Sequence, residues 1–130
     1  MKCYVFRLKP GQDLKKEIEL LTKKNNIKAG FILTCVGSLN NACLRLADES
    51  VKDFNKKFEI VSLVGTLSQD GVHLHLSVSD SKGNTIGGHL KEGCIVNTTA
   101  EIVVGCLENC LFSRKFDINT GFKELKINRL

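Results

Sequence analysis

The alternation of apolar and polar residues in many short segments constrains the fold of this chain more than any other feature. A strand places successive side chains on opposite faces of a sheet, so a period of two predicts a strand with one buried face. The segments with this pattern are residues 2–8, 42–48, 58–68, 73–79, 85–90, 112–117 and 122–128. A chain with so many of these segments is predicted to form a β-sheet whose strands are joined by short turns.

Two longer apolar runs add to this set. Residues 29–39 form a β-rich run that ends at Gly37-Ser38, which predicts a buried strand or a strand followed by a turn. Residues 94–107 are predicted to open with a helical turn and to continue as a long apolar strand.

One segment has the period of a helix instead. Leu14, Ile18 and Leu21 recur at helical spacing between residues 13 and 25, and charged residues fill the positions between them. Asn25-Asn26 is predicted to end this amphipathic helix.

Many strands and one strong helix predict an α+β fold. We expect a central, mostly antiparallel β-sheet, with a barrel-like closure as an alternative, and one main helix packed on it. No repeat, linker or low-complexity stretch divides the sequence, so we expect a single domain over residues 1–130. The predicted sheet surface is larger than one helix can cover, which favours an oligomer.

Composition narrows the class of protein further. No apolar run approaches the ~18–20 residues of a membrane span, and the first residues lack the pattern of a signal peptide, so we expect a cytoplasmic protein with no membrane partner. The six cysteines lack the spacing of a disulfide framework, which predicts free, mostly buried thiols. The net charge of +5 comes from scattered lysines and arginines, which is typical of a solvated surface.

All three histidines of the sequence lie within residues 71–93. If SVSDSKGNTI is a hairpin centred on Lys82, the antiparallel register places His75 opposite His89. His73 then points to the same side as His75, because residues two apart in a strand share a face. Such positions lie roughly 5–6.5 Å apart, which lets three imidazoles converge on one ion. Asp80 is expected to cap the hairpin loop.

Three histidines are a ligand set that leaves one tetrahedral position of a zinc ion open. Gly87 and Gly88 remove side chains where an ion or another backbone needs room. The alternative is that the histidines only occupy the wet face of a half-buried strand, since Leu74 and Leu76 take the core face. A shift of one residue in the loop would also break the histidine pairing. Spacing alone leaves both interpretations open.

Two more side chains are candidates for a role at such a site. Glu101 lies among apolar residues in TTAEIVV, which makes it the candidate catalytic residue, as a general base or an orienting carboxylate beside a metal. Its alternative is an outward-facing strand position in contact with water. Arg45 is a candidate for binding an anionic ligand or for pairing with Glu101, and the sequence leaves these two roles open. No nucleophile motif, P-loop or dinucleotide-binding fingerprint is present.

The paired motifs GVHLHLSVSD and GGHLKEGCIVNTTAE, with FEIVSLVGTLS and IKAGFILTCVGSLNNACLRL, resemble the plant-and-prokaryote conserved (PPC) domain. The resemblance runs in order from about Tyr4 to Val104. It implies a central antiparallel sheet with a packed helix, assembly as a homotrimer, and in some members a metal ion on the histidines of the motif. Those histidines correspond here to His73, His75 and His89, and zinc is favoured because imidazole ligands suit it.

The resemblance also implies a DNA-associated or regulatory binding module. Plant members carry AT-hook segments whose Arg-Gly-Arg core contacts the minor groove, and the arginines of this sequence lie outside any such pattern. We therefore expect self-assembly and partner binding, with DNA contact lacking its usual element. The alternative function is a metal-dependent enzyme or a small-ligand-binding protein that uses the open position of the histidine site. A trimer with a purely structural metal is the third.

Overall fold

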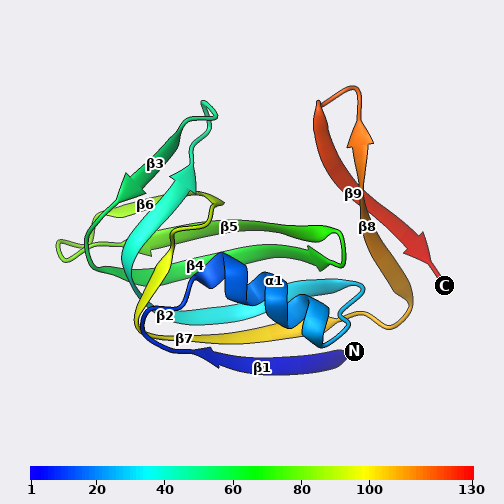
Figure 1. The fold of residues 1–130 in the computed structure, drawn as a ribbon, viewed down its shortest axis with the longest axis horizontal. Helices are drawn as coiled ribbons and strands as arrows, with labels where there is room; N and C mark the ends of the chain where they lie inside the picture. Colours follow the sequence, from blue (N-terminus) through cyan, green and yellow to red (C-terminus); the bar gives the residue numbers. More distant parts are fainter.

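The computed structural model describes all 130 residues, Met1–Leu130, as nine strands and one helix (Figure 1). In chain order the elements are β1 (Lys2–Leu8), α1 (Leu14–Lys24), β2 (Gly30–Arg45), β3 (Val51–Phe54), β4 (Phe58–Ser68), β5 (Gly71–Ser79), β6 (Thr85–Leu90), β7 (Ile95–Cys106), β8 (Cys110–Asp117) and β9 (Phe122–Arg129). The predicted α+β architecture is confirmed. With 11 residues, α1 is too short to cross a membrane.

Seven of the strands form one antiparallel sheet in the order β1-β7-β2-β4-β5-β6, and β3 pairs with β2. The long strand β2 also pairs with β6, through Leu44 and Arg45, so the sheet bends back on itself at this end. Strands β1 and β3 each pair with one neighbour only and remain free edges. The sheet is therefore strongly bent at the end of β2 and keeps β1 and β3 as edge strands.

Helix α1 lies across one face of the sheet (Figure 1). Leu14 and Ile18 of the helix are buried in a core of 22 residues, together with inward-pointing leucines of the strands such as Leu74 and Leu76. Burying these side chains on one face is the main stabilising contribution to such a fold. The opposite, outer face of the sheet carries no helix.

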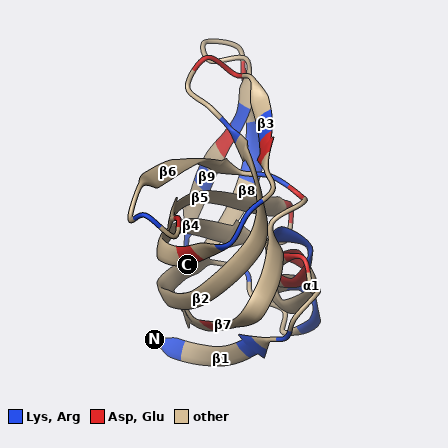
Figure 2. Ribbon diagram, turned by 90° about the vertical axis from the view of Figure 1, so that its left-hand side faces the viewer, with Lys and Arg blue, Asp and Glu red and all other residues tan.

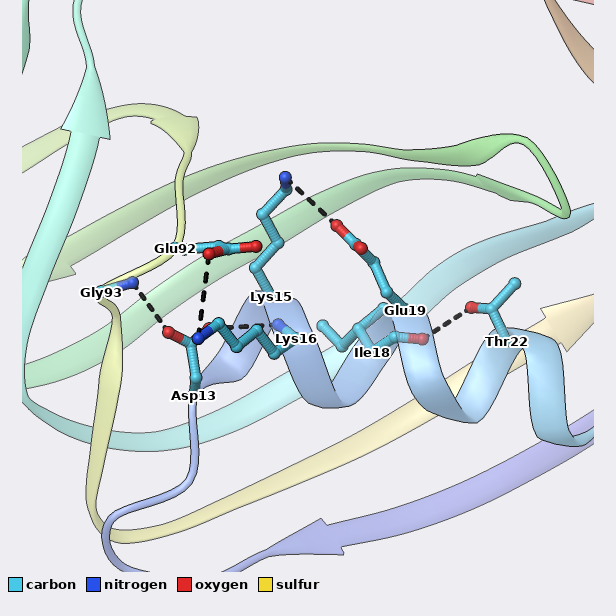
Figure 3. A network of polar contacts seen from close by, with 8 residues as sticks. All are labelled: Asp13, Lys15, Lys16, Ile18, Glu19, Thr22, Glu92 and Gly93. Atoms are coloured by element: carbon cyan, nitrogen blue, oxygen red, sulfur yellow. Dashed lines mark hydrogen bonds and ion pairs between the residues drawn. The ribbon is translucent and has the colours of Figure 1, made fainter.

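The start of α1 is fixed by one carboxylate (Figure 3). The backbone N–H of Lys16 donates to Asp13 Oδ1 at 3.1 Å, which is a helix N-cap, and the N–H of Gly93 donates to Asp13 Oδ2 at 2.8 Å. Asp13 thus joins the helix to the turn before β7. Lys15 and Glu19, one turn apart, form an ion pair at 3.1 Å on the helix surface.

Three details differ from the sequence predictions. Residues 29–39 and 42–48 belong largely to the single strand β2, so of the two alternatives at Gly37-Ser38 the strand is observed and the turn is not. Irregular register with β7 after Gly37 absorbs the residues that resembled a turn. The helical turn expected at the start of residues 94–107 is absent, because Ile95 already pairs with Asn41 in the sheet. Strand β3 was not predicted, since it has only four residues and most of them are exposed.

Strands β8 and β9 form a separate two-stranded hairpin that stands beside the end of the sheet (Figure 1). It is attached through a few hydrogen bonds: the N–H of Phe112 donates to the backbone oxygen of Lys28 at 2.9 Å, and the N–H of Arg114 donates to the carboxylate oxygen Oδ2 of Asp70 at 3.1 Å. Phe116 and Ile127 of the hairpin are exposed. The hairpin therefore depends on the sheet for its position far more than on a core of its own.

Candidate metal centre and ligand cavity

The three histidines meet on the outer face of the sheet. His75 of β5 lies directly opposite His89 of β6, as the register predicted from the sequence requires. His73, two residues before His75, points to the same face. The ring centres lie 5.1 Å (His73–His75), 5.2 Å (His73–His89) and 5.6 Å (His75–His89) apart. One nitrogen from each ring lies within 4.8 Å of the others.

The register of this hairpin is fixed at both its loop and its core face. The carboxylate of Asp80 accepts hydrogen bonds from the N–H groups of Lys82 at 2.9 Å and of Asn84 at 3.0 Å, which confirms its predicted place as the cap of the loop. Leu74 and Leu76 are buried on the other face of β5. A slip by one residue would expose both leucines and bury the histidines, so the core selects the observed register.

Gly88 and Gly65 let neighbouring backbones approach the histidines closely. A Cβ atom at Gly88 would lie 2.7 Å from the carbonyl oxygen of Arg45, so only glycine lets β6 reach the end of β2. Gly65 has a φ of +150°, and a Cβ atom there would overlap the carbonyl oxygen of His73. Of the two roles considered for Gly88, room for another backbone is therefore the one observed.

Their surroundings keep two of the imidazoles neutral at neutral pH. Burial, followed by the positive charges of Arg45 and the other histidines, lowers the pKa of His89 to about 4. Burial and then the guanidinium of Arg114 lower the pKa of His73. A neutral imidazole keeps a nitrogen lone pair, which is the form that binds a metal.

The donor set fits a zinc ion. It offers three imidazole nitrogens and no carboxylate, and zinc binds such nitrogens at about 2.0–2.1 Å with one position left for another ligand. Separations of up to 4.8 Å between the three nitrogens bring all of them within reach of a single ion after small rotations of the rings. The ligand positions come from two strands held by one hairpin, so the backbone holds them together without a metal.

A cavity of about 340 Å³ lies beside the histidines, between the sheet and the β8–β9 hairpin. Its wall includes His73 and His89 from the sheet and Arg45 from the end of β2. The hairpin contributes Arg114 from β8 and Phe122 from β9. This size suits a small molecule.

Arg45 is brought to the site, whereas Glu101 is not. The guanidinium Nη2 of Arg45 lies 3.4 Å from His89 Nδ1, and its Cζ lies 5.5 Å from the ring centre of Phe122. Glu101 is exposed on β7, opposite Arg7 of β1 and Val36 of β2, and it does not line the cavity. No ion pair between Arg45 and Glu101 is formed, because the ion pairs of the structure are made by lysines.

The acid that does line the cavity is Glu124 of β9, and sequence reasoning missed it together with Arg114. Both lie in alternating segments near the end of the chain, where nothing marks them as different from solvated strand residues. Arg114 Nη2 donates to Thr66 Oγ1 of β4 at 2.7 Å. That contact depends on how the hairpin packs beside the sheet, which no local pattern encodes.

The fold and the histidine cluster define an α+β sheet domain with a candidate metal centre on its outer face. Residues 1–108 match the Plants and Prokaryotes Conserved (PCC) domain family, and the chain belongs to this family. The resemblance to the PPC domain drawn from the sequence motifs is thereby confirmed.

Two curated relatives place the domain in longer proteins. The chain is 50% identical over 128 residues to the bifunctional protein GlmU of Synechococcus sp. (strain JA-2-3B'a(2-13)), a match that covers 98% of this chain and 20% of that protein. It is 30% identical over 112 residues to the AT-hook motif nuclear-localized protein 10 of Arabidopsis thaliana, covering 78% of this chain and 32% of that protein. The chain thus spans a fifth to a third of these relatives.

Three solved structures share the fold. A hypothetical protein from Salmonella enterica superposes with a TM-score of 0.95 at 40% identity, over 98% of this chain and 94% of that chain. A metal-containing protein from Archaeoglobus fulgidus gives 0.82 at 27% identity, over 97% and 94%. A candidate DNA-binding protein from Bacteroides thetaiotaomicron gives 0.84 at 25% identity, over 95% and 91%.

Proposed function

We infer that this chain is a binding module of the PCC family whose functional site is a zinc ion held by His73, His75 and His89. The observation that carries this proposal is the meeting of three imidazole nitrogens within 4.8 Å on opposed strands. The similarity to a metal-containing protein from Archaeoglobus fulgidus supports it. When bound, the ion would be held by these three histidines and would supply a coordination position for another ligand, next to the cavity that His73 and His89 line.

The assembly that we propose is a homotrimer in the cytoplasm. Support comes from the outer face of the sheet, where Val5, Val36 and Val64 are 74%, 56% and 54% exposed. Val64 lies opposite His75, so this apolar surface reaches the histidines. Exposed apolar surface of this kind favours contact with another subunit. The six free cysteines suit a reducing compartment.

Metal content per subunit tests the proposed centre. Protein purified without an affinity tag is expected to contain about one zinc per chain by mass spectrometry, and His75→Ala to lose it. Ser79→Ala is the matched control, because Ser79 lies on the same strand and face as His75 but away from the cluster. A wild-type protein that takes up no stoichiometric metal even after zinc is added would overturn the proposal.

Light scattering coupled to size exclusion tests the assembly. We expect the mass of three chains for the wild-type protein and a smaller mass for Val36→Asp, which places a charge on the outer face. Leu20→Asp is the control, since Leu20 is similarly exposed, at 59%, on the helix. A monomeric wild-type protein, or an equal effect of both variants, would exclude a trimer built on the outer face.

DNA association is the second candidate function, and the similarity to a candidate DNA-binding protein from Bacteroides thetaiotaomicron supports it. Figure 2 shows lysine and arginine positions distributed over several elements with acidic positions among them, rather than gathered in one stripe. Binding through phosphates alone is therefore expected to be weak and to fall steeply with salt. Fluorescence anisotropy with a labelled duplex at about 50 and 200 mM salt measures this. No binding at the lower salt concentration would exclude this function.

A further inference from the structure

The cavity beside the histidines is lined by two arginines, and the carboxylate of Glu124 acts on Arg114 without forming an ion pair with it. Arg114 donates to the hydroxyl of Thr66, and Arg45 lies against the Phe122 ring and His89. Neither guanidinium forms an ion pair, since the three ion pairs of the structure are all made by lysines elsewhere. Both side chains are half-buried, and both line the cavity.

The charge of the cavity wall favours an anion. Arg45, Arg114 and Lys123 contribute three positive charges, against Asp70 and Glu124 with two negative charges. The carboxylate of Asp70 is already engaged by the backbone N–H of Arg114. Three neutral imidazoles would leave the full charge of a bound zinc ion unbalanced, so metal loading makes the wall more positive. Guanidinium groups bind carboxylate and phosphate oxygens with paired hydrogen bonds.

The contact between Arg45 and His89 connects the two arginines to the proposed metal centre. A guanidinium only donates hydrogen bonds, so in this contact His89 Nδ1 must accept, and Nε2 then carries the ring proton. A neutral imidazole has one in-plane lone pair, which can serve either Arg45 or a metal ion, but not both. If zinc binds Nδ1, it takes the position of the donor. If zinc binds Nε2, the proton moves to Nδ1, which can no longer accept.

We propose that the cavity binds a small oxyanion, a carboxylate or a phosphate, between Arg45 and Arg114, and that metal loading and oxyanion binding promote each other because the metal releases Arg45 from His89. The oxyanion site stands on the two arginines alone, whereas the coupling rests on the metal centre proposed above. Linkage requires the effect to be reciprocal: the oxyanion raises metal affinity by the same factor as the metal raises oxyanion affinity.

Calorimetric titration with malonate and with inorganic phosphate, each into metal-free protein and into desalted zinc-loaded protein, tests both parts and distinguishes the two chemistries. We expect tighter binding to the zinc-loaded form, and a loss of about 10-fold or more in Arg45→Met and Arg114→Gln, the size expected for a charged hydrogen bond. Arg7→Gln removes an exposed arginine on β1 and serves as the control. Arg114→Lys is a second variant that keeps the positive charge, so that a loss of binding in Arg114→Gln can be distinguished from a change in how the hairpin packs.

Zinc affinity, measured by competition with a chromophoric chelator, tests the release of Arg45. Arg45→Met is expected to bind zinc about 2–10-fold more tightly, because a competing hydrogen bond is removed. Lys91→Met is the matched control, since Lys91 acts on His89 only through its charge. An equal gain in both variants would overturn the release of Arg45.

The outcomes separate this inference from the proposed metal centre. Failure to bind zinc overturns the metal centre and the coupling, while titration of metal-free protein still decides the oxyanion site. The site is overturned if neither anion binds either form, or if the arginine variants bind as the wild type does. Equal affinity of the metal-free and zinc-loaded forms overturns the coupling.

Discussion

The sheet and the β8–β9 hairpin line the same cavity, but they are held in place in different ways. The sheet buries a 22-residue core against α1 and pairs its long strand β2 with four others. The hairpin pairs only with itself, and Phe116 and Ile127 remain exposed on it. The strands that carry the histidines are therefore held by the core. The strand that carries Arg114 pairs only with the other strand of its hairpin. A ligand cavity built in this way can keep its metal ligands fixed while its other wall moves.

The largest expected effect is a loss of stability when a buried side chain of the core, on the face of β5 opposite to the histidines, is shortened. Leu74→Ala is expected to lower the free energy of unfolding by about 2–5 kcal/mol, since Leu74 is buried between His73 and His75 in sequence. Urea denaturation at fixed protein concentration measures the change. Phe116→Ala on the exposed hairpin should stay within about 0.5 kcal/mol. A similar loss of unfolding free energy in both variants would show that the hairpin contributes to stability as much as the sheet does.

Hydrogen exchange should show the next largest difference. Amides in the central strands β2, β4 and β7 are expected to exchange about 100-fold or more slowly than those of β8 and β9, because the hairpin can open without disrupting the core. Mass spectrometry of peptic fragments measures both regions in one sample. Equal protection would mean that another subunit covers the hairpin, and comparison across protein concentrations would then show protection rising with assembly.

Thiol reactivity offers a smaller and more local contrast. Burial raises the pKa of Cys35 and of Cys94 to about 12, so both should resist iodoacetamide in the native protein. Cys110 is also buried, but it begins strand β8 and should become accessible whenever the hairpin opens. We expect Cys110 to react about 10-fold faster than Cys35. Exposed Cys3 is the internal reference, and equal rates at Cys110 and Cys35 would count against independent opening.

The last contrast concerns the dependence of stability on pH, and it belongs to the sheet. The pKa of folded His89 is about 4 and that of His73 is lowered, against 6.5 without the fold. The unfolded chain then binds more protons, so metal-free protein should lose stability as pH falls from about 6.5 towards 4. Denaturation midpoints across this range should fall for the wild type and stay flatter for His89→Asn. Two carboxylates with lowered pKa, Asp48 and Asp80, lose their contribution only at lower pH.

Local patterns were sufficient for most of the sheet but not for its long-range geometry. The hairpin register could be predicted because the alternation of Leu74 and Leu76 with the histidines fixes both faces, and Asp80 marks the loop. The continuity of β2 could not be predicted from the sequence. Gly37 is a typical turn residue, and only the pairing of β2 with β7 keeps it within a strand. Arg114 and Glu124 reach the cavity through packing between two sheets, which leaves no local signature.

The antiparallel pairing of β1 with β7 has a consequence for how the chain folds. Tyr4 pairs with Val104 and Leu8 with Ala100, so β1 pairs with a strand that lies roughly a hundred residues later in the chain. Until then β1 has no partner, and its alternating apolar residues remain open to other contacts. Contacts of such large sequence separation slow folding, and domains dominated by them fold in about milliseconds to seconds. Strand β1 is thus made well before its partner β7 and is among the last strands of this domain to enter the sheet.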